Sequence, residues 1–275
     1  MAAMPPLDWV NDPPDVLRRS YADTRAALAG DAPGDVRVSD IAIAGVTGLH
    51  FTPLGAGARA PILYFHGGGW VVGSPQTHVA LCAWLAKLSG RVVISAAYRL
   101  APEHRYPAQR KDARAVLAAV SDRFGRVFVA GDSAGAAMAL WADAGASSAV
   151  LGVVGLYGAF GVTDSPSIRA FGPASDGLQR ADIVSFYKRL GLEDASVIRA
   201  DFGASGAPVL LIKAAEDSLA DDADILAAHL TERQIDIWTA PGQPHAFLQQ
   251  VGRNAAARYW MARVASWINA RDADR

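Results

Sequence analysis

Residues 127–135 read VFVAGDSAG, and this stretch decides the fold. An apolar, β-branched run ends in Gly-Asp-Ser-Ala-Gly, and an alanine-rich stretch of helical character follows it. This order predicts a strand, a sharp turn with Ser133 at its apex and a helix, which would lift the serine hydroxyl above a sheet. Gly131 and Gly135 carry no β-carbon, so the strand and the helix can approach each other closely.

The rest of the chain supplies partners for this serine. A serine hydroxyl is a weak nucleophile, so it needs a base, an orienting acid and hydrogen-bond donors for a developing oxyanion. His245 follows the strand-like run 235–239, and Asp217 follows the buried-strand run 209–212. The chain order Ser133, Asp217, His245 is typical of α/β hydrolases, and each residue lies at the carboxyl end of an expected strand, where sites of open α/β sheets gather. We therefore predict these three as the catalytic residues.

A glycine-rich turn upstream of the serine motif predicts an oxyanion hole. The run ILYFH at 62–66 continues into GGGW at 67–70. Successive glycines let the backbone turn its N–H groups toward one point, and a further donor is the N–H that follows the nucleophile. We assign the donors to Gly68, Gly69 and Ala134.

Three motifs together carry a family resemblance: HGGGW at 66–70, YRLAPEH at 98–104 and GDSAG at 131–135. From about residue 60 onward the chain resembles the hormone-sensitive-lipase-like esterases, in their bacterial branch with an aspartate before the serine. The resemblance implies an α/β-hydrolase fold, a Ser-Asp-His triad, hydrolysis of carboxylic esters with short acyl chains, and a helical cap over the pocket. It implies no cofactor and no metal.

The chain departs from this family pattern in places. Ala136 stands where a further glycine is frequent, and Asp217-Ser218-Leu219 stands where the family usually has Asp-Pro-Leu. The interval between Ser133 and Asp217, which holds the second cap insertion, is short for the family. We therefore expect a reduced cap over a shallower and more open pocket.

The patterning along the chain predicts the fold class. Strand and helix patterns alternate, which indicates a mostly parallel sheet of about eight strands with right-handed crossovers, flanked by helices and carrying a small helical cap. We expect a single α/β-hydrolase domain over residues 1–275, with cap segments at 1–35 and 159–204. Besides the nucleophile strand, the expected strands are 36–43, a short one around Phe51, 61–66, 92–98, 150–157, 209–214 and 235–240. The first expected helix starts at Asp12-Pro13-Pro14, with Asp12 as the capping acid and a proline at the first helical position, and runs to about Leu28. The last two expected helices cover 219–233 and 246–270.

Composition narrows the range of functions. Hydrophobic residues make up 51% of the chain, enough for a sheet buried on both faces. A net charge of −1 without a basic block argues against a nucleic-acid partner. Cys82 is the sole cysteine, and no Cys/His cluster suggests a metal site. Residues 1–10 lack a basic, apolar leader, and no run approaches ~20 apolar residues, so we expect a cytoplasmic enzyme with no membrane span. A homo-oligomer remains open.

Each site residue has a competing interpretation. His245 is favoured as the base over the other five histidines, because His66 and His104 are structural in the family and the rest lie before the sheet or in expected helices. Asp217 has rivals in Glu216, Asp221 and Asp222. Asp132 is interpreted as a structural hydrogen bonder. Trp70 and Phe160 are the candidate substrate-binding residues, and Trp70 either lines the acyl pocket or packs under the cap.

The function predicted from these residues is hydrolysis of a small-molecule ester through an acyl-enzyme on Ser133. An arylformamidase or another amidase would use the same triad, and HGGxW turns also occur in formamidase-like enzymes. A small-molecule receptor built on a hydrolase fold is the non-enzymatic alternative. Such receptors are expected to lose a triad member, whereas this chain keeps all three.

Overall fold

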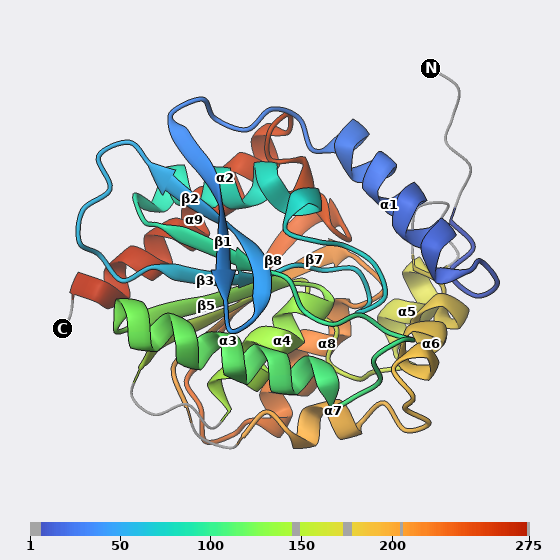
Figure 1. Cartoon of the computed structure of the whole chain (residues 1–275). Helices are drawn as coiled ribbons and strands as arrows, with labels where there is room; N and C mark the ends of the chain where they lie inside the picture. Colours follow the sequence, from blue (N-terminus) through green and yellow to red (C-terminus); the bar gives the residue numbers. More distant parts are fainter. Residues whose placement is uncertain (1–6, 145–148, 173–177, 204–205, 274–275) are drawn as a thin grey trace.

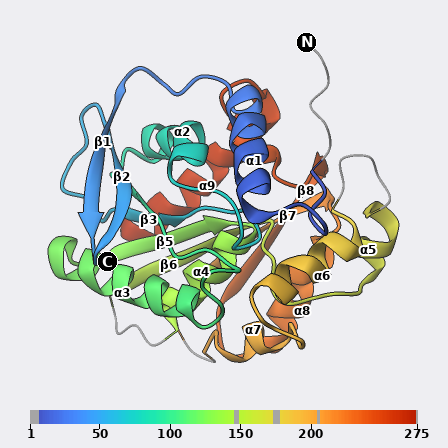
Figure 2. The ribbon, with the colours of Figure 1, turned by 45° about the vertical axis from the view of Figure 1, so that its right-hand side comes forward.

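The protein is described by a computed structural model that covers residues 7–144, 149–172, 178–203 and 206–273. Parts of both expected cap segments, residues 1–6, 173–177 and 204, lie outside the described residues. A central twisted sheet is covered by helices on both faces (Figures 1 and 2). The core is accordingly divided into two apolar clusters, one on each side of the sheet.

The described residues form one eight-stranded sheet in the order β1-β2-β4-β3-β5-β6-β7-β8. β2 runs antiparallel to both of its neighbours, β1 and β4, and every neighbouring pair from β4 to β8 is parallel. The prediction of an α/β-hydrolase fold with a mostly parallel sheet of about eight strands is therefore confirmed. The strands are β1 (Val36–Ile43), β2 (Val46–Pro53), β3 (Ile62–Phe65), β4 (Val93–Ala96), β5 (Val127–Asp132), β6 (Val150–Leu156), β7 (Val209–Glu216) and β8 (Ile235–Pro244).

Helices α2 and α9 cover one face of the sheet, and α3, α4 and α8 cover the other (Figure 2). Helices α1 and α6 lie apart from these layers, beside the ends of the parallel strands (Figures 1 and 2). The helices of the described residues are α1 (Pro14–Leu28), α2 (Val79–Ser89), α3 (Ala108–Phe124), α4 (Ala134–Asp143), α5 (Pro166–Phe171), α6 (Arg180–Arg189), α7 (Val197–Ala200), α8 (Ala220–His229) and α9 (Ala255–Ala273), with short 3₁₀ turns η1 (Gln76–His78) and η2 (Phe247–Gln250).

The unit β5–α4 lies at the centre of the molecule and contains residues 127–135, the stretch VFVAGDSAG. All six residues of β5 and all ten of α4 are buried. A strand covered by helices on both faces has no polar face, which explains the continuous apolar run that precedes Gly131. The small alanine side chains of α4 let the helix lie close to β5 and β3.

The helix expected at 246–270 begins later than predicted, and β8 extends further. Ala246 has a left-handed backbone (φ 59°), and only the short turn η2 follows it. Helix α9 starts at Ala255, where the Asn254 side chain accepts the N–H groups of Ala256 and Ala257 at 2.8 and 3.3 Å. Asparagine is a favoured residue at this capping position, so the sequence did contain the start signal that the apolar periodicity obscured.

Candidate active site

Ser133 lies at the tight turn between β5 and α4, in a strained conformation. Its backbone has φ 51° and ψ −119°, a combination that residues with a side chain rarely adopt and that occurs mostly where function requires it. A β-carbon at Gly135 would lie 2.1 Å from the carbonyl oxygen of Phe65, and one at Gly131 would lie equally close to the carbonyl oxygen of Gly135. The two glycines are therefore required by the close approach of α4 to β5 and β3.

The structure brings Ser133, His245 and Asp217 together in one series of contacts. His245 Nε2 lies 3.2 Å from Ser133 Oγ, and His245 Nδ1 lies 2.7 Å from Asp217 Oδ2. The Asp217 side chain is 1% exposed and also accepts the backbone N–H of Leu219 at 2.9 Å. A buried carboxylate on Nδ1 fixes the ring and leaves Nε2 facing the hydroxyl, which is the arrangement needed for proton transfer from serine.

The glycine-rich turn lies beside this hydroxyl with an unusual backbone. Gly68, Gly69 and Trp70 have φ values of 123°, 58° and 60°. Among the hydrogen bonds of the described residues, none uses the backbone N–H groups of Gly68, Gly69 or Ala134. Backbone N–H groups without a protein partner are available to a ligand oxygen.

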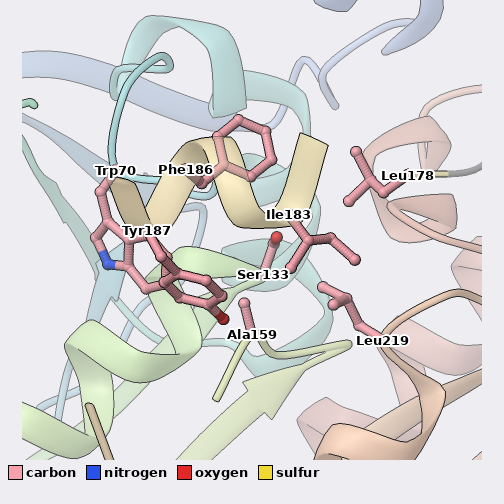
Figure 3. Close-up of a pocket in the computed structure, with 9 residues that line it drawn as sticks. Trp70, Ser133, Ala159, Leu178, Ile183, Phe186, Tyr187 and Leu219 are labelled. Atoms are coloured by element: carbon pink, nitrogen blue, oxygen red, sulfur yellow. The ribbon is translucent and has the colours of Figure 1, made fainter. Parts of the chain in front are cut away.

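A small cavity of about 20 Å³ adjoins Ser133. Figure 3 shows the serine side chain beneath α6, with Ile183, Phe186 and Tyr187 projecting from that helix around it. The lining residues are Gly69, Trp70, Ser133, Ala159, Leu178, Ile183, Phe186, Tyr187 and Leu219. The described residues therefore form a narrow, covered cavity rather than the open one expected from the short chain.

The cavity is narrow because α6 sits directly on the glycine turn. The Phe186 ring fills the space in which a side chain at position 69 would stand, and a β-carbon there would lie 2.4 Å from Phe186 Cδ1. Trp70 lines the cavity and also packs against Tyr187 of α6, with ring centroids 5.6 Å apart. The two interpretations of Trp70 thus hold at once.

Phe160 is not among the residues that line this cavity. Its side chain is fully buried, and its ring meets Phe202 edge to face at a centroid distance of 5.9 Å. The backbone of Phe160 is the part that connects to other elements, because its N–H donates to Asp222 at 2.6 Å and its carbonyl accepts from Arg199 at 2.8 Å. The structure therefore places Phe160 in the core behind the cavity wall.

The other histidines lie away from the Ser133 hydroxyl. His66 is buried, its Nδ1 lies 2.8 Å from the carbonyl oxygen of Gly67, and burial lowers the pKa of its imidazole to about 3. His50 stacks on Phe124, and partial burial lowers its pKa. His78 is buried beside Asp132. Of the histidines, the structure brings His245 to Ser133.

Sequence reasoning missed a group of polar residues behind the triad. Asp132, predicted as a structural hydrogen bonder, is fully buried and accepts hydrogen bonds from Tyr64, Gly67 and Gln249. Gln249 had no signal in the sequence, because its position was expected inside a helix with an apolar face.

The described residues hold neither a metal-binding cluster nor a membrane-spanning helix. Within the described residues, no three His, Cys, Asp or Glu side chains gather as a metal site would require. No helix in the described part of the chain is long and apolar enough to cross a lipid bilayer.

Comparison with known proteins extends the similarity over most of the chain. A family model described as the alpha/beta hydrolase fold matches residues 62–249. An acetyl esterase of Salmonella paratyphi A is 32% identical over 237 residues, which span 75% of this chain and 73% of that protein. An esterase of Pyrobaculum calidifontis has a TM-score of 0.87 and 27% identity, over 97% of this chain and 95% of that one.

A hormone-sensitive lipase from a metagenome library is similar to the same extent. Its structure has a TM-score of 0.85 and 27% identity, over 95% of this chain and 92% of that one. These matches agree with the strand order, with the turn at Ser133 and with the three sequence motifs. The chain therefore belongs to the α/β-hydrolase family and, within it, to the hormone-sensitive-lipase-like esterases.

Proposed function

We propose that this carboxylic ester hydrolase is a serine esterase for short acyl groups, with acetyl esters as its best substrates. The observation that carries the proposal is the unbroken series of contacts from Asp217 through His245 to Ser133, next to a cavity of about 20 Å³. The similarity to a protein named acetyl esterase supports the choice of acyl group.

In the first step, Ser133 Oγ attacks the ester carbonyl while His245 Nε2 takes its proton. Asp217 holds the ring through Nδ1 and stabilises the imidazolium that forms. His245 then gives the proton to the departing alcohol, and the acyl group remains on Ser133. Water enters, loses a proton to His245 and releases the acid by the same route in reverse.

The oxyanion of each tetrahedral intermediate would be held by the N–H groups of Gly68, Gly69 and Ala134. Each such donor contributes roughly 3 kcal/mol to lowering the barrier. The support for this assignment is that these N–H groups have no hydrogen-bond partner among the described residues. Ala134 follows the serine in the chain, and Gly69 lines the same cavity as Ser133.

The size of the cavity supports a short acyl group. A water molecule needs about 10–15 Å³ of comparable space, so the cavity beside Ser133 has room for one or two groups of methyl size. A longer acyl chain would require α6 to move, because Ile183, Phe186 and Tyr187 of that helix form one wall.

We further propose that residues 1–35 and 159–204 form the cap of a single domain spanning residues 1–275. The two segments meet in the described structure: the Ser185 hydroxyl donates to the carbonyl of Trp9 at 2.9 Å, and the Trp9 ring lies 5.1 Å from that of Phe186. Trp9 thus supports the same aromatic ring that narrows the cavity.

A series of p-nitrophenyl esters from acetate to long chains tests the proposal, with Ser133→Ala and a serine-directed organophosphate as controls. We expect an initial burst, rates that fall with chain length, and labelling at Ser133. Ser133→Ala should lose roughly a millionfold in kcat while remaining folded. Faster turnover of a matched anilide or formamide would favour the amidase alternative, and ligand binding without acylation would favour a receptor.

A further inference from the structure

A buried polar network lies behind the triad, on the side away from the cavity. Its centre is Asp132, whose side chain is fully buried. Oδ1 of Asp132 accepts the Tyr64 hydroxyl at 2.8 Å and the backbone N–H of Gly67 at 2.9 Å, and Oδ2 accepts the Gln249 amide at 2.7 Å. None of these residues lines the cavity beside Ser133.

Gln249 spans two charged groups. It lies in η2, four positions after His245, and it is 5% exposed. Its Oε1 accepts from Arg25 of α1 at 2.5 Å, while its Nε2 donates to Asp132. A cation on one side and a carboxylate on the other fix the orientation of the amide, because only the oxygen can accept and only the nitrogen can donate.

The network ties together the three turns that hold the reactive groups. Asp132 immediately precedes Ser133, and Gly67 immediately precedes Gly68. Gln249 shares its loop with His245. The hydrogen bond from Gln249 to Asp132 is thus a direct side-chain link from the loop of the base to the turn of the nucleophile, and Gly67 extends it to the glycine turn.

We propose that Gln249 is a positioning residue for the esterase reaction: by donating to Asp132, it sets the distance between the His245 loop and the turns that carry Ser133 and Gly68. This inference rests on the proposed function. Gln249 touches no substrate; it acts through the placement of the base and of the oxyanion donors. A misplacement of about 1 Å in such groups is enough to cost roughly a hundredfold in rate.

The electrostatics of the network favour an amide at position 249. Burial raises the pKa of the Asp132 carboxyl, but His78 and the hydrogen bonds from Gln249 and Tyr64 outweigh burial and hold the pKa below its usual value. Asp132 is therefore a carboxylate that requires donors. Gln249 supplies one without adding a charge to a site that already holds the Arg25 guanidinium and the Asp132 carboxylate.

Gln249→Met tests the link, because methionine keeps the shape of the side chain and removes its hydrogen-bonding groups. We expect kcat for p-nitrophenyl acetate to fall by at least tenfold with KM within twofold, and phosphorylation of Ser133 by the organophosphate to slow by the same factor. Gln250→Met makes the same change at the neighbouring, less buried position and should leave both rates unchanged. Equal rates in Gln249→Met and wild type would overturn the inference.

Gln249→Glu provides a second test that does not depend on a stability difference. The groups facing the introduced carboxyl are Asp132, His78, Arg25 and Tyr21, with Tyr64 and His66 behind Asp132. When ionised, that carboxyl cannot donate to Asp132; when protonated at low pH, it can. The activity ratio of the variant to the wild type should therefore rise as pH falls.

A ratio that stays flat with pH would contradict a positioning role and leave only a packing role. The inference and the proposed function fail in different ways. If the wild type neither hydrolyses esters nor reacts with the organophosphate, the proposed function is wrong. If the wild type does both and the Gln249 variants behave like it at every pH, only the inference about Gln249 is wrong.

Discussion

The catalytic loops and the cap are positioned by different kinds of interaction. The turns at Ser133, Asp217 and His245 continue directly from the parallel strands β5, β7 and β8, so the register of the sheet places them. Arginines that donate to backbone carbonyls join the two cap segments to each other and to the rest of the molecule. The first arrangement requires particular residue types at particular positions, and the second does not.

Two arginines illustrate the cap arrangement. Arg189 of α6 donates to the carbonyl of Asp12 at 2.9 Å, which ties α6 to the segment before α1. Arg18 of α1 donates to the carbonyl of Val71 at 2.9 Å, just after the glycine turn, and pairs with Glu103 of the YRLAPEH motif. Every residue has a carbonyl, so the partner of such an arginine leaves no mark in the sequence.

The largest effect is expected where the catalytic loops lose their orienting acid. Asp217→Asn keeps the shape of the side chain but stabilises the wrong tautomer of His245, so kcat should fall roughly ten-thousandfold. The measurement is steady-state turnover of p-nitrophenyl acetate, normalised to folded protein. Glu216→Gln, a matched change at the exposed neighbour, should leave kcat unchanged. If the two substitutions had equal effects, the acid would be misassigned.

A smaller effect is expected where the cap meets the glycine turn. Gly69→Ala introduces a β-carbon at φ 58° and 2.4 Å from Phe186, so the oxyanion donors should shift and kcat should fall roughly a hundredfold. The double variant Gly69→Ala with Phe186→Ala separates the causes. Partial recovery of kcat would identify the contact with Phe186 as the cause; no recovery would assign the whole loss to backbone strain.

The catalytic loops could be predicted from the sequence better than the cap, because the loops require particular residue types at particular positions and the cap contacts do not. Ser133 was recognisable because its strained turn needs glycine at 131 and 135, and the parallel strands were recognisable because burial on both faces makes them continuously apolar. Phe160 was expected at the substrate, yet it is buried against Phe202. An apolar ring in an irregular segment gives no periodicity from which its direction can be inferred.

The connection of α6 to the N-terminal segment should affect binding more than chemistry. Arg189→Met removes the hydrogen bonds to the carbonyls of Trp9, Val10 and Asp12. Because Phe186 and Trp9 would then be less firmly held over the cavity, we expect KM for p-nitrophenyl acetate to rise several-fold with kcat nearly unchanged. Arg180→Met, at an exposed position on the same helix, is the matched control. A fall in kcat at constant KM would contradict the assignment of α6 to the cap.

The smallest effect concerns Asp222, which joins the acid loop to the segment after β6. Asp222 is fully buried in α8, and its Oδ1 accepts the N–H of Phe160 at 2.6 Å. Its Oδ2 has no hydrogen-bond partner among the described residues. Burial raises the pKa of this carboxyl well above its ordinary value, and the nearby Asp217 raises it further, although the hydrogen bond from Phe160 acts in the opposite direction.

The sign of the resulting pH dependence follows from the raised pKa. An unfolded chain releases this proton at a pH of about 4, whereas the folded protein retains it, so the contribution of Asp222 to stability falls as pH rises above that value. Asp222→Asn keeps an acceptor for the Phe160 N–H and removes the titration. The melting temperature of the variant minus that of the wild type, measured by thermal unfolding, should therefore increase as pH rises from 4 to 8. A constant difference across that range would mean that Asp222 is ionised in the fold and that Arg199, which donates to the carbonyl of Phe160, neutralises it.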